Sequence, residues 1–147
     1  MPVMRSLSIV LLLFLVPAVK SPSALTFKPL EPREVIVEGN LHYTIVDAQG
    51  LAAMLMKKDF LFINVHIPYE GEIEKTDLFI PFNEIEKNLD KLPADKDAKI
   101  VLYCRTDRMS NIAAKSLVKL GYKNVWVLEG GMIVWEQAGH PLLFKGR

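Results

Sequence analysis

The sequence predicts a single α/β domain with a mostly parallel central sheet. Segments with strand-like and helix-like patterns alternate between residues 42 and 139, which is typical of a sheet whose strands are joined by helices. The segment FLFINVH at 60–66 is nearly all apolar before its end, as expected for a strand that is covered on both faces. The chain has 147 residues, half of them hydrophobic, and no internal repeat, so one core is expected.

Residues 25–40 carry Pro29 and Pro32 and are predicted to form an extended lead-in to a domain at 41–144. Within that domain the pattern predicts, in chain order, a strand at 42–46, a helix at 48–58, strands at 60–66 and 78–81, a helix at 82–92, a strand at 99–104, a helix at 111–121, a strand at 124–129 and a helix at 132–139.

Local signals support the ends of these elements. Asp47 and Ser110 stand where an N-cap residue is expected, each directly ahead of a predicted helix. Ile85 and Leu89 have the spacing of one helical face. The predicted strands are rich in β-branched and aromatic residues, and the glycine pair at 130–131 ends the last of them.

The first two dozen residues differ from the rest of the chain. Arg5 is the only charged residue before a 13-residue apolar run from Leu7 to Val19, which is too short to cross a bilayer, since that takes about 20 residues. Small residues follow, among them Ser23 and Ala24. We expect residues 1–24 to be a signal peptide and the protein to be periplasmic or extracellular, tethered to the membrane if the signal is not cleaved.

The charge balance argues against two classes of partner. Residues 1–24 hold two basic residues and no acidic one, so 16 basic residues remain against 17 acidic ones in the rest of the chain. This balance, without aromatic–basic interleaving, is not expected of a nucleic-acid-binding protein. No charge block indicates a membrane-surface patch.

The only cysteine lies in the stretch YCRTDRMS, between a predicted strand and a predicted helix. A loop of this kind, over 105–109, can point several backbone N–H groups at one spot and so bind an anion. The same donors would lower the pKa of the Cys104 thiol, and Arg105 and Arg108 add positive charge. The alternative is a cysteine that packs at a strand end while both arginines point into water. The local pattern alone leaves these two interpretations about equal.

Longer stretches of the chain resemble a single rhodanese domain over residues 41–144. YCRTDRMS resembles the active-site loop of that family, and FINVHIPYEGEI at 62–73 occupies the place of its Asp-Val-Arg segment. The segment at 120–142 resembles the final strand and helix of the family, with matching residues at Gly130, Gly131, Trp135, Gly139 and Pro141.

This resemblance implies a five-stranded, mostly parallel sheet with helices on both faces. It implies that Cys104 takes a sulfane sulfur from thiosulfate or a similar donor and passes it, as a persulfide, to a thiol or cyanide. A small molecule and another protein are the two expected sources of the acceptor thiol. The arginines would attract the donor, and no metal or organic cofactor is implied. The loop residues expected to hold the anion are Arg105, Thr106, Asp107, Arg108 and Met109.

The sequence also departs from the family pattern. Asp107 stands where the family usually has glycine, which accepts positive φ freely, and Met109 stands where many members have arginine. Asn64, His66 and Glu72 replace an Asp, an Arg and a His. Related dual-specificity phosphatases have an arginine six positions after the cysteine. Serine stands at that position here, so phosphatase activity is not expected.

Other candidate residues receive simpler interpretations. The three histidines lack the spacing of metal ligands, so no metal site is expected. His66 is a candidate for the pocket lining because it ends a strand near Cys104. Met132 and Met109 are candidates for the pocket rim, and the glutamates at 70, 72 and 74 are expected in a solvated loop.

The sequence therefore predicts an exported, single-domain, rhodanese-like sulfurtransferase with Cys104 as nucleophile. The alternative is a rhodanese-fold module that binds a partner or senses redox state without turnover. The substitutions at Asp107 and at 64–66 motivate this alternative.

Overall fold

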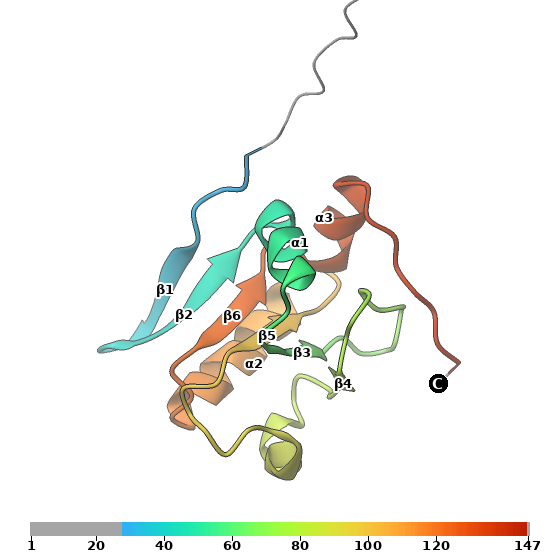
Figure 1. Ribbon diagram of the computed structural model, residues 1–147. Helices are drawn as coiled ribbons and strands as arrows, with labels where there is room; N and C mark the ends of the chain where they lie inside the picture. Colours follow the sequence, from blue (N-terminus) through green and yellow to red (C-terminus); the bar gives the residue numbers. More distant parts are fainter. Residues whose placement is uncertain (1–27, 147) are drawn as a thin grey trace, which may run out of the picture.

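The computed structural model describes residues 28–146, which form a central sheet with helices on both faces (Figure 1). The strand order is β1-β2-β6-β5-β3-β4. The β1 strand is antiparallel to β2, and all other neighbours are parallel. The strands are β1 (Arg33–Glu38), β2 (Leu41–Val46), β3 (Leu61–Asn64), β4 (Leu78–Phe79), β5 (Ile100–Tyr103) and β6 (Val125–Leu128). The helices are α1 (Ala48–Met56), the 3₁₀ helix η1 (Ile85–Lys91), α2 (Arg108–Lys119) and α3 (Gly131–Gln137).

Two apolar layers cover the sheet. Helices α1 and α3 pack on one face, and α2 and η1 pack on the other (Figure 1). The β5 strand contributes to both layers because successive side chains of a strand point to opposite faces. Ile100 and Leu102 join the α2 layer, whereas Val101 and Tyr103 join the α1–α3 layer, and all four are fully buried. The strand that leads to Cys104 is therefore held from both sides.

The predicted lead-in contains a sixth strand. Residues 33–38 pair with β2 in an antiparallel hairpin, so the expectation of five strands was one too few. Val35 and Val37 pack against the α2 layer, while Glu34, Ile36 and Glu38 are exposed. This alternation is typical of an edge strand with one covered face.

The helix expected at 82–92 is a 3₁₀ helix with a kink. Asn88 has non-helical backbone angles, with φ −121° and ψ 26°, and its side-chain amide donates to the Glu84 carbonyl at 2.8 Å. A side chain that binds the backbone in this way competes with regular α-helical hydrogen bonds.

One predicted helix cap is confirmed and the other is wrong. The Asp47 carboxylate accepts a hydrogen bond from the Gly50 N–H at 2.7 Å, as an N-cap should. Helix α2 begins at Arg108, three residues earlier than a Ser110 cap would allow, and Asp107 occupies the N-cap position. Ser110 is therefore inside the first turn, where its hydroxyl donates to the Asp107 carbonyl at 3.0 Å.

The signal peptide predicted at 1–24 lies outside the described residues. Within residues 28–146, no helix combines the length and the apolar character needed to cross a membrane.

Candidate active site

Cys104 follows β5 directly and lies at the C-terminal edge of the parallel strands. The neighbours of β5 are β6 and β3, both parallel to it, and ligands of open α/β sheets bind outside this edge. Cys104 is 1% exposed and packs in the α2 layer. Its Sγ lies 3.5 Å from the Ser110 hydroxyl oxygen. The thiol therefore faces the first turn of α2.

The loop after Cys104 turns its carbonyl groups toward α3. The N–H groups of Met132 and Ile133 donate to the carbonyls of Cys104 and Arg105, at 2.9 and 3.0 Å. The peptide units of this loop are trans, so each N–H points opposite to the carbonyl of the same unit. The N–H groups of Arg105 and Thr106 therefore point away from α3, toward the face on which the Cys104 side chain lies.

These loop N–H groups are available to a ligand. Among residues 28–146, the N–H groups of Arg105, Thr106 and Asp107 donate no hydrogen bond. The Arg108 N–H has only a long contact of 3.4 Å, to the Thr106 hydroxyl. Consecutive free N–H groups ahead of a 12-residue helix form the kind of concavity that binds anions. The anion-binding role of residues 105–109 stays a prediction, which these unpaired N–H groups support.

Gly131 allows this arrangement. A Cβ at this position would lie 2.3 Å from both the Cys104 and the Thr106 carbonyl oxygens, and the φ of Gly131 is +58°. Only glycine combines such a close backbone approach with a left-handed conformation at low cost. The glycine pair therefore has a second role besides ending the last strand. Gly131 allows the backbone of the cysteine loop to pack directly against the start of α3.

The Asp107 carboxylate contacts the start of α3. Its Oδ2 accepts a long hydrogen bond of 3.4 Å from the Gly130 N–H. The pKa of Tyr43 is raised by burial and, to a smaller extent, by the Asp107 charge. Among the described residues the carboxylate forms no ion pair with Arg105 or Arg108. The backbone φ of Asp107 is −168°, outside the left-handed region that favours glycine.

The two arginines of the loop have different surroundings. Arg105 Nε lies 3.5 Å from Glu70 Oε2, and Arg105 Nη1 lies 4.0 Å from Glu136 Oε2. Arg108 is exposed, and no acidic side chain among residues 28–146 pairs with it. Arg108 is therefore the loop arginine whose charge remains available to a donor.

His66 contacts the same carboxylate as Arg105. Its Nε2 lies 2.6 Å from Glu70 Oε2, and the residue is 8% exposed. Asn64 holds the segment that carries His66 and Glu70 in place. Its side chain accepts a hydrogen bond from the His66 N–H and donates one to the Gly71 carbonyl, both at 3.0 Å. His66 thus reaches the cysteine loop through Glu70 and Arg105, and its place in the pocket lining stays a prediction.

Two further expectations are wrong, and the expected place of Met109 on the pocket rim stays a prediction. Met132 is fully buried in the α1–α3 layer, so its expected place on the pocket rim is wrong. Met109 is half-buried against the α2 layer. Glu72, expected in a solvated loop, is fully buried; Lys145 forms an ion pair with it, and Tyr69 donates to it at 3.2 Å. The backbone of Glu72 pairs with Leu143, so the C-terminal segment covers Glu72.

Sequence reasoning missed a hydroxyl network beneath the site. The Tyr103 hydroxyl accepts from the Ile73 N–H at 2.9 Å and contacts the Thr76 hydroxyl at 2.7 Å. Burial raises the pKa of Tyr103 well above its ordinary value of 10.0. The only available signal was a phenol inside an otherwise apolar strand, which needs a polar partner when buried.

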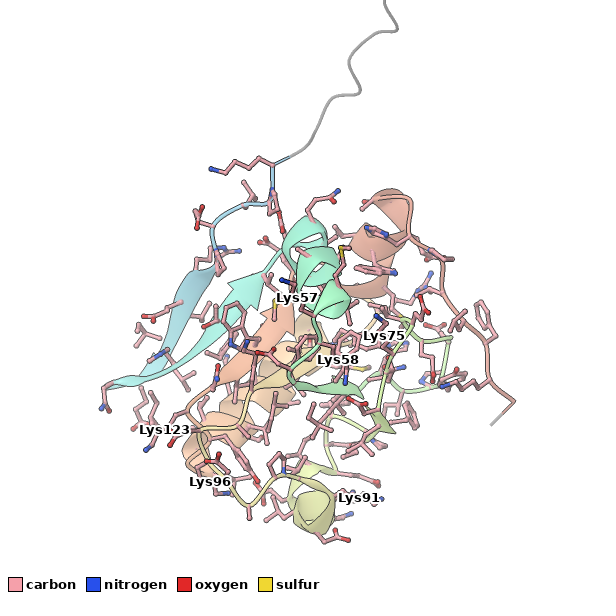
Figure 2. All side chains as sticks on the ribbon, in the orientation of Figure 1. Lys57, Lys58, Lys75, Lys91, Lys96 and Lys123 are labelled. Atoms are coloured by element: carbon pink, nitrogen blue, oxygen red, sulfur yellow. The ribbon has the colours of Figure 1, made fainter. Side chains whose placement is uncertain are left out.

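Two lysines of the chain lie far from this edge. Figure 2 shows Lys96 and Lys123 beside the segments that lead into β5 and β6, at the opposite edge of the sheet from Cys104. Within residues 28–146, no group of three or more His, Cys, Asp or Glu side chains could hold a metal ion. The cavities of about 300 Å³ lined by Leu41 and Tyr122, by Pro29 and Trp126, and by Leu55 and Trp135 do not include Cys104.

Comparisons with known proteins identify the family. The family model for the rhodanese-like domain matches residues 42–138. A sulfurtransferase of Allochromatium vinosum is 31% identical over 102 residues, which cover 67% of this chain and 92% of that protein. A tRNA uridine(34) hydroxylase of Erwinia tasmaniensis is 34% identical over 110 residues, which cover 68% of this chain. That match takes in 31% of the hydroxylase, so the chain spans about a third of that relative's length.

Solved structures agree on the fold. A rhodanese-related protein from Thermoplasma volcanium has a TM-score of 0.58 at 25% identity, over 68% of this chain and 97% of that one. A rhodanese-like domain protein from Staphylococcus aureus has a TM-score of 0.57 at 24% identity, over 69% and 98%, and it bears on the fold alone. The α/β fold and the resemblance found in the sequence are confirmed: the chain belongs to the rhodanese-like domain family.

Proposed function

We propose that the protein is a sulfurtransferase that carries sulfane sulfur on Cys104. One observation supports this most: a thiol at the end of β5 lies on the same side of the loop as free N–H groups that can hold an anion. Membership in the rhodanese-like family and the sulfurtransferase relative agree with this activity. Thiosulfate, or a donor with a similar sulfane sulfur, is the proposed substrate class.

In the first half-reaction, the Cys104 thiolate attacks the outer sulfur of the donor. A new S–S bond forms to Sγ while the S–S bond of thiosulfate breaks, and sulfite leaves with the bonding electron pair. The thiolate is the nucleophilic form of cysteine. The free N–H groups of Arg105, Thr106 and Asp107 would stabilise the negative charge on the transferred sulfur.

In the second half-reaction, an acceptor attacks the outer sulfur of the persulfide. A thiolate acceptor becomes a persulfide, or cyanide becomes thiocyanate, and the Cys104 thiolate leaves with the electron pair of the S–S bond. No net oxidation or reduction occurs over the cycle, so no redox cofactor is required. The acceptor thiol can belong to a small molecule or to another protein.

Two cationic features would favour anionic donors at the loop. The N-terminus of α2 carries a partial positive charge that is strongest in its first turn, where the Ser110 hydroxyl also meets Cys104 Sγ. Arg108 is exposed in the same turn. We assign the attraction of the donor to these two features, with a smaller share for Arg105 because two carboxylates lie next to it.

The second candidate function is a module of the same fold that binds a partner or senses redox state without turnover. The burial of Cys104, which is 1% exposed, favours this candidate, because a donor must reach Sγ before sulfur transfer can begin. The two candidate functions make opposite predictions: the sulfurtransferase forms a persulfide on Cys104, and the binding or sensing module does not.

The deciding experiment is the intact mass of the purified protein after incubation with thiosulfate. We expect the mass to rise by one sulfur atom, the gain to be absent in Cys104→Ser, and cyanide to reverse it. A folded protein with a free thiol that gains no sulfur would support the binding or sensing module. Asp107→Gly then shows whether the carboxylate is the obstacle, since sulfur loading of that variant alone would identify it.

We also propose that residues 1–24 direct export and are then removed. N-terminal sequencing of the protein from an expressing cell is expected to start near Leu25. A mature protein that begins at Met1 would instead mean an uncleaved leader, and a tethered form would then be found with the membrane fraction.

A further inference from the structure

One carboxylate oxygen of Glu70 contacts both a histidine and an arginine side chain. Its Oε2 lies 2.6 Å from His66 Nε2 and 3.5 Å from Arg105 Nε. Glu136 of α3 approaches the other side of the guanidinium, at 4.0 Å from Nη1. These contacts come from three separate segments, namely the loop after β3, the loop after β5 and helix α3.

These carboxylates change the charge at the entrance to the cysteine loop. Arg105 is the residue next to the nucleophile, yet it has two acidic neighbours. Asp107 adds a third carboxylate on the same loop, directed toward Gly130. Arg108 is exposed without an acidic partner among the described residues. The loop therefore presents far less net positive charge than its sequence of two arginines suggests.

We infer that Glu70 is a specificity-determining residue, which lowers the preference of Cys104 for dianionic donors relative to donors of lower negative charge. This inference rests on the proposed sulfurtransferase function. Thiosulfate is a dianion, so it loses most when the positive field of Arg105 is offset. An organic donor with the same sulfane sulfur and a single negative charge, such as a thiosulfonate, loses less.

The two donor classes undergo the same transfer. The Cys104 thiolate attacks the sulfane sulfur, the S–S bond of the donor breaks, and the leaving group takes the electron pair. That group is sulfite from thiosulfate and methanesulfinate from methanethiosulfonate. The reacting sulfur is equivalent and the charge of the donor differs, so the ratio of the two rates reports the electrostatic field at the loop.

The first test does not depend on sulfur transfer. Iodoacetate and iodoacetamide alkylate the same thiolate, and only the former is an anion, so the ratio of their rates cancels any change in the thiolate fraction. At low ionic strength we expect Glu70→Gln to raise the iodoacetate-to-iodoacetamide ratio by about two- to fivefold, the range set by an exposed ion pair. High salt should remove the increase, because it screens exposed charges.

Two variants calibrate this result. Glu136→Gln should raise the ratio less than Glu70→Gln, because Glu136 lies farther from the guanidinium. Glu38→Gln should leave it unchanged, since Glu38 is exposed at the β1–β2 turn, at the opposite edge of the sheet (Figure 1). An unchanged ratio in folded Glu70→Gln, or an equal rise in Glu38→Gln, would overturn the inference. So would a wild-type thiol that reacts with neither reagent.

The second test measures persulfide formation with thiosulfate and with methanethiosulfonate. We expect Glu70→Gln to raise the thiosulfate-to-methanethiosulfonate ratio of kcat/KM by the same two- to fivefold factor. A donor ratio that does not move would refute the role of Glu70 in donor preference. If neither donor loads sulfur while the alkylation ratio responds, the proposed function fails and the effect of Glu70 on the charge at the loop stands.

Discussion

The close approach of Gly131 to the cysteine loop makes Gly131→Ala an informative substitution. The added Cβ would lie 2.3 Å from the carbonyl oxygens of Cys104 and Thr106 and 2.7 Å from the Arg105 carbonyl carbon. All three are backbone atoms, so no side chain can rotate away to relieve the contact. Either the loop or the start of α3 must move.

The chain offers a matched control in Gly39→Ala. Gly39 has φ +54°, close to the +58° of Gly131, but a Cβ there would meet no atom within 4 Å. Both substitutions carry the cost of an alanine in the left-handed region, about 1–2 kcal/mol. The difference between them therefore isolates the effect of the close approach.

The magnitude of that difference follows from the hydrogen bonds that join the loop to α3. Movement of the loop would weaken the bonds from Met132 N to Cys104 O and from Ile133 N to Arg105 O, now 2.9 and 3.0 Å long. Each contributes about 0.5–1.5 kcal/mol. We therefore expect Gly131→Ala to lower the free energy of unfolding by about 1–3 kcal/mol more than Gly39→Ala.

Urea unfolding measures the stability of both variants, and the rate of sulfur loading from thiosulfate measures the loop. Gly131→Ala should also slow loading, because the N–H groups that face the thiol move with the loop, whereas Gly39→Ala should load at the wild-type rate. Equal destabilisation by both variants would refute the reasoning, since the close approach would then cost nothing.

Two further predictions concern the scaffold. Asp47→Ala removes the hydrogen bond to the Gly50 N–H and should cost about 1 kcal/mol in urea unfolding, whereas Asp59→Ala, an exposed site, should stay within about 0.5 kcal/mol. Tyr103→Phe leaves the buried Ile73 N–H without its acceptor and should cost about 1–3 kcal/mol. Because burial raises the pKa of Tyr103 above its ordinary 10.0, the unfolded chain loses this proton first as the pH rises. The contribution of Tyr103 is therefore fully present below pH 10 and falls above it, so the stability of the wild type should decline more steeply than that of Tyr103→Phe above about pH 10.

The local sequence predicted the fold class and placed Cys104, the proposed nucleophile, between a strand and a helix. The strand that ends at Cys104 was visible because four consecutive apolar residues, 100–103, suit a strand buried on both faces. The helix after it was visible from its apolar spacing, although its start was misplaced by the expected cap at Ser110. Such signals are local, since they depend on the period of the pattern and on turn chemistry within a few residues.

The tertiary structure alone decided the electrostatics of the site. Arg105 is 35 residues from Glu70 and 31 from Glu136 along the chain, and no local pattern links them. They meet because the order β6-β5-β3 places the loop after β3 and the helix after β6 on either side of the cysteine loop. The burial of Glu72 likewise depends on the C-terminal segment that pairs with it. The sequence specifies which side chains are charged, but the electrostatic field at the site depends on which distant segments fold beside one another.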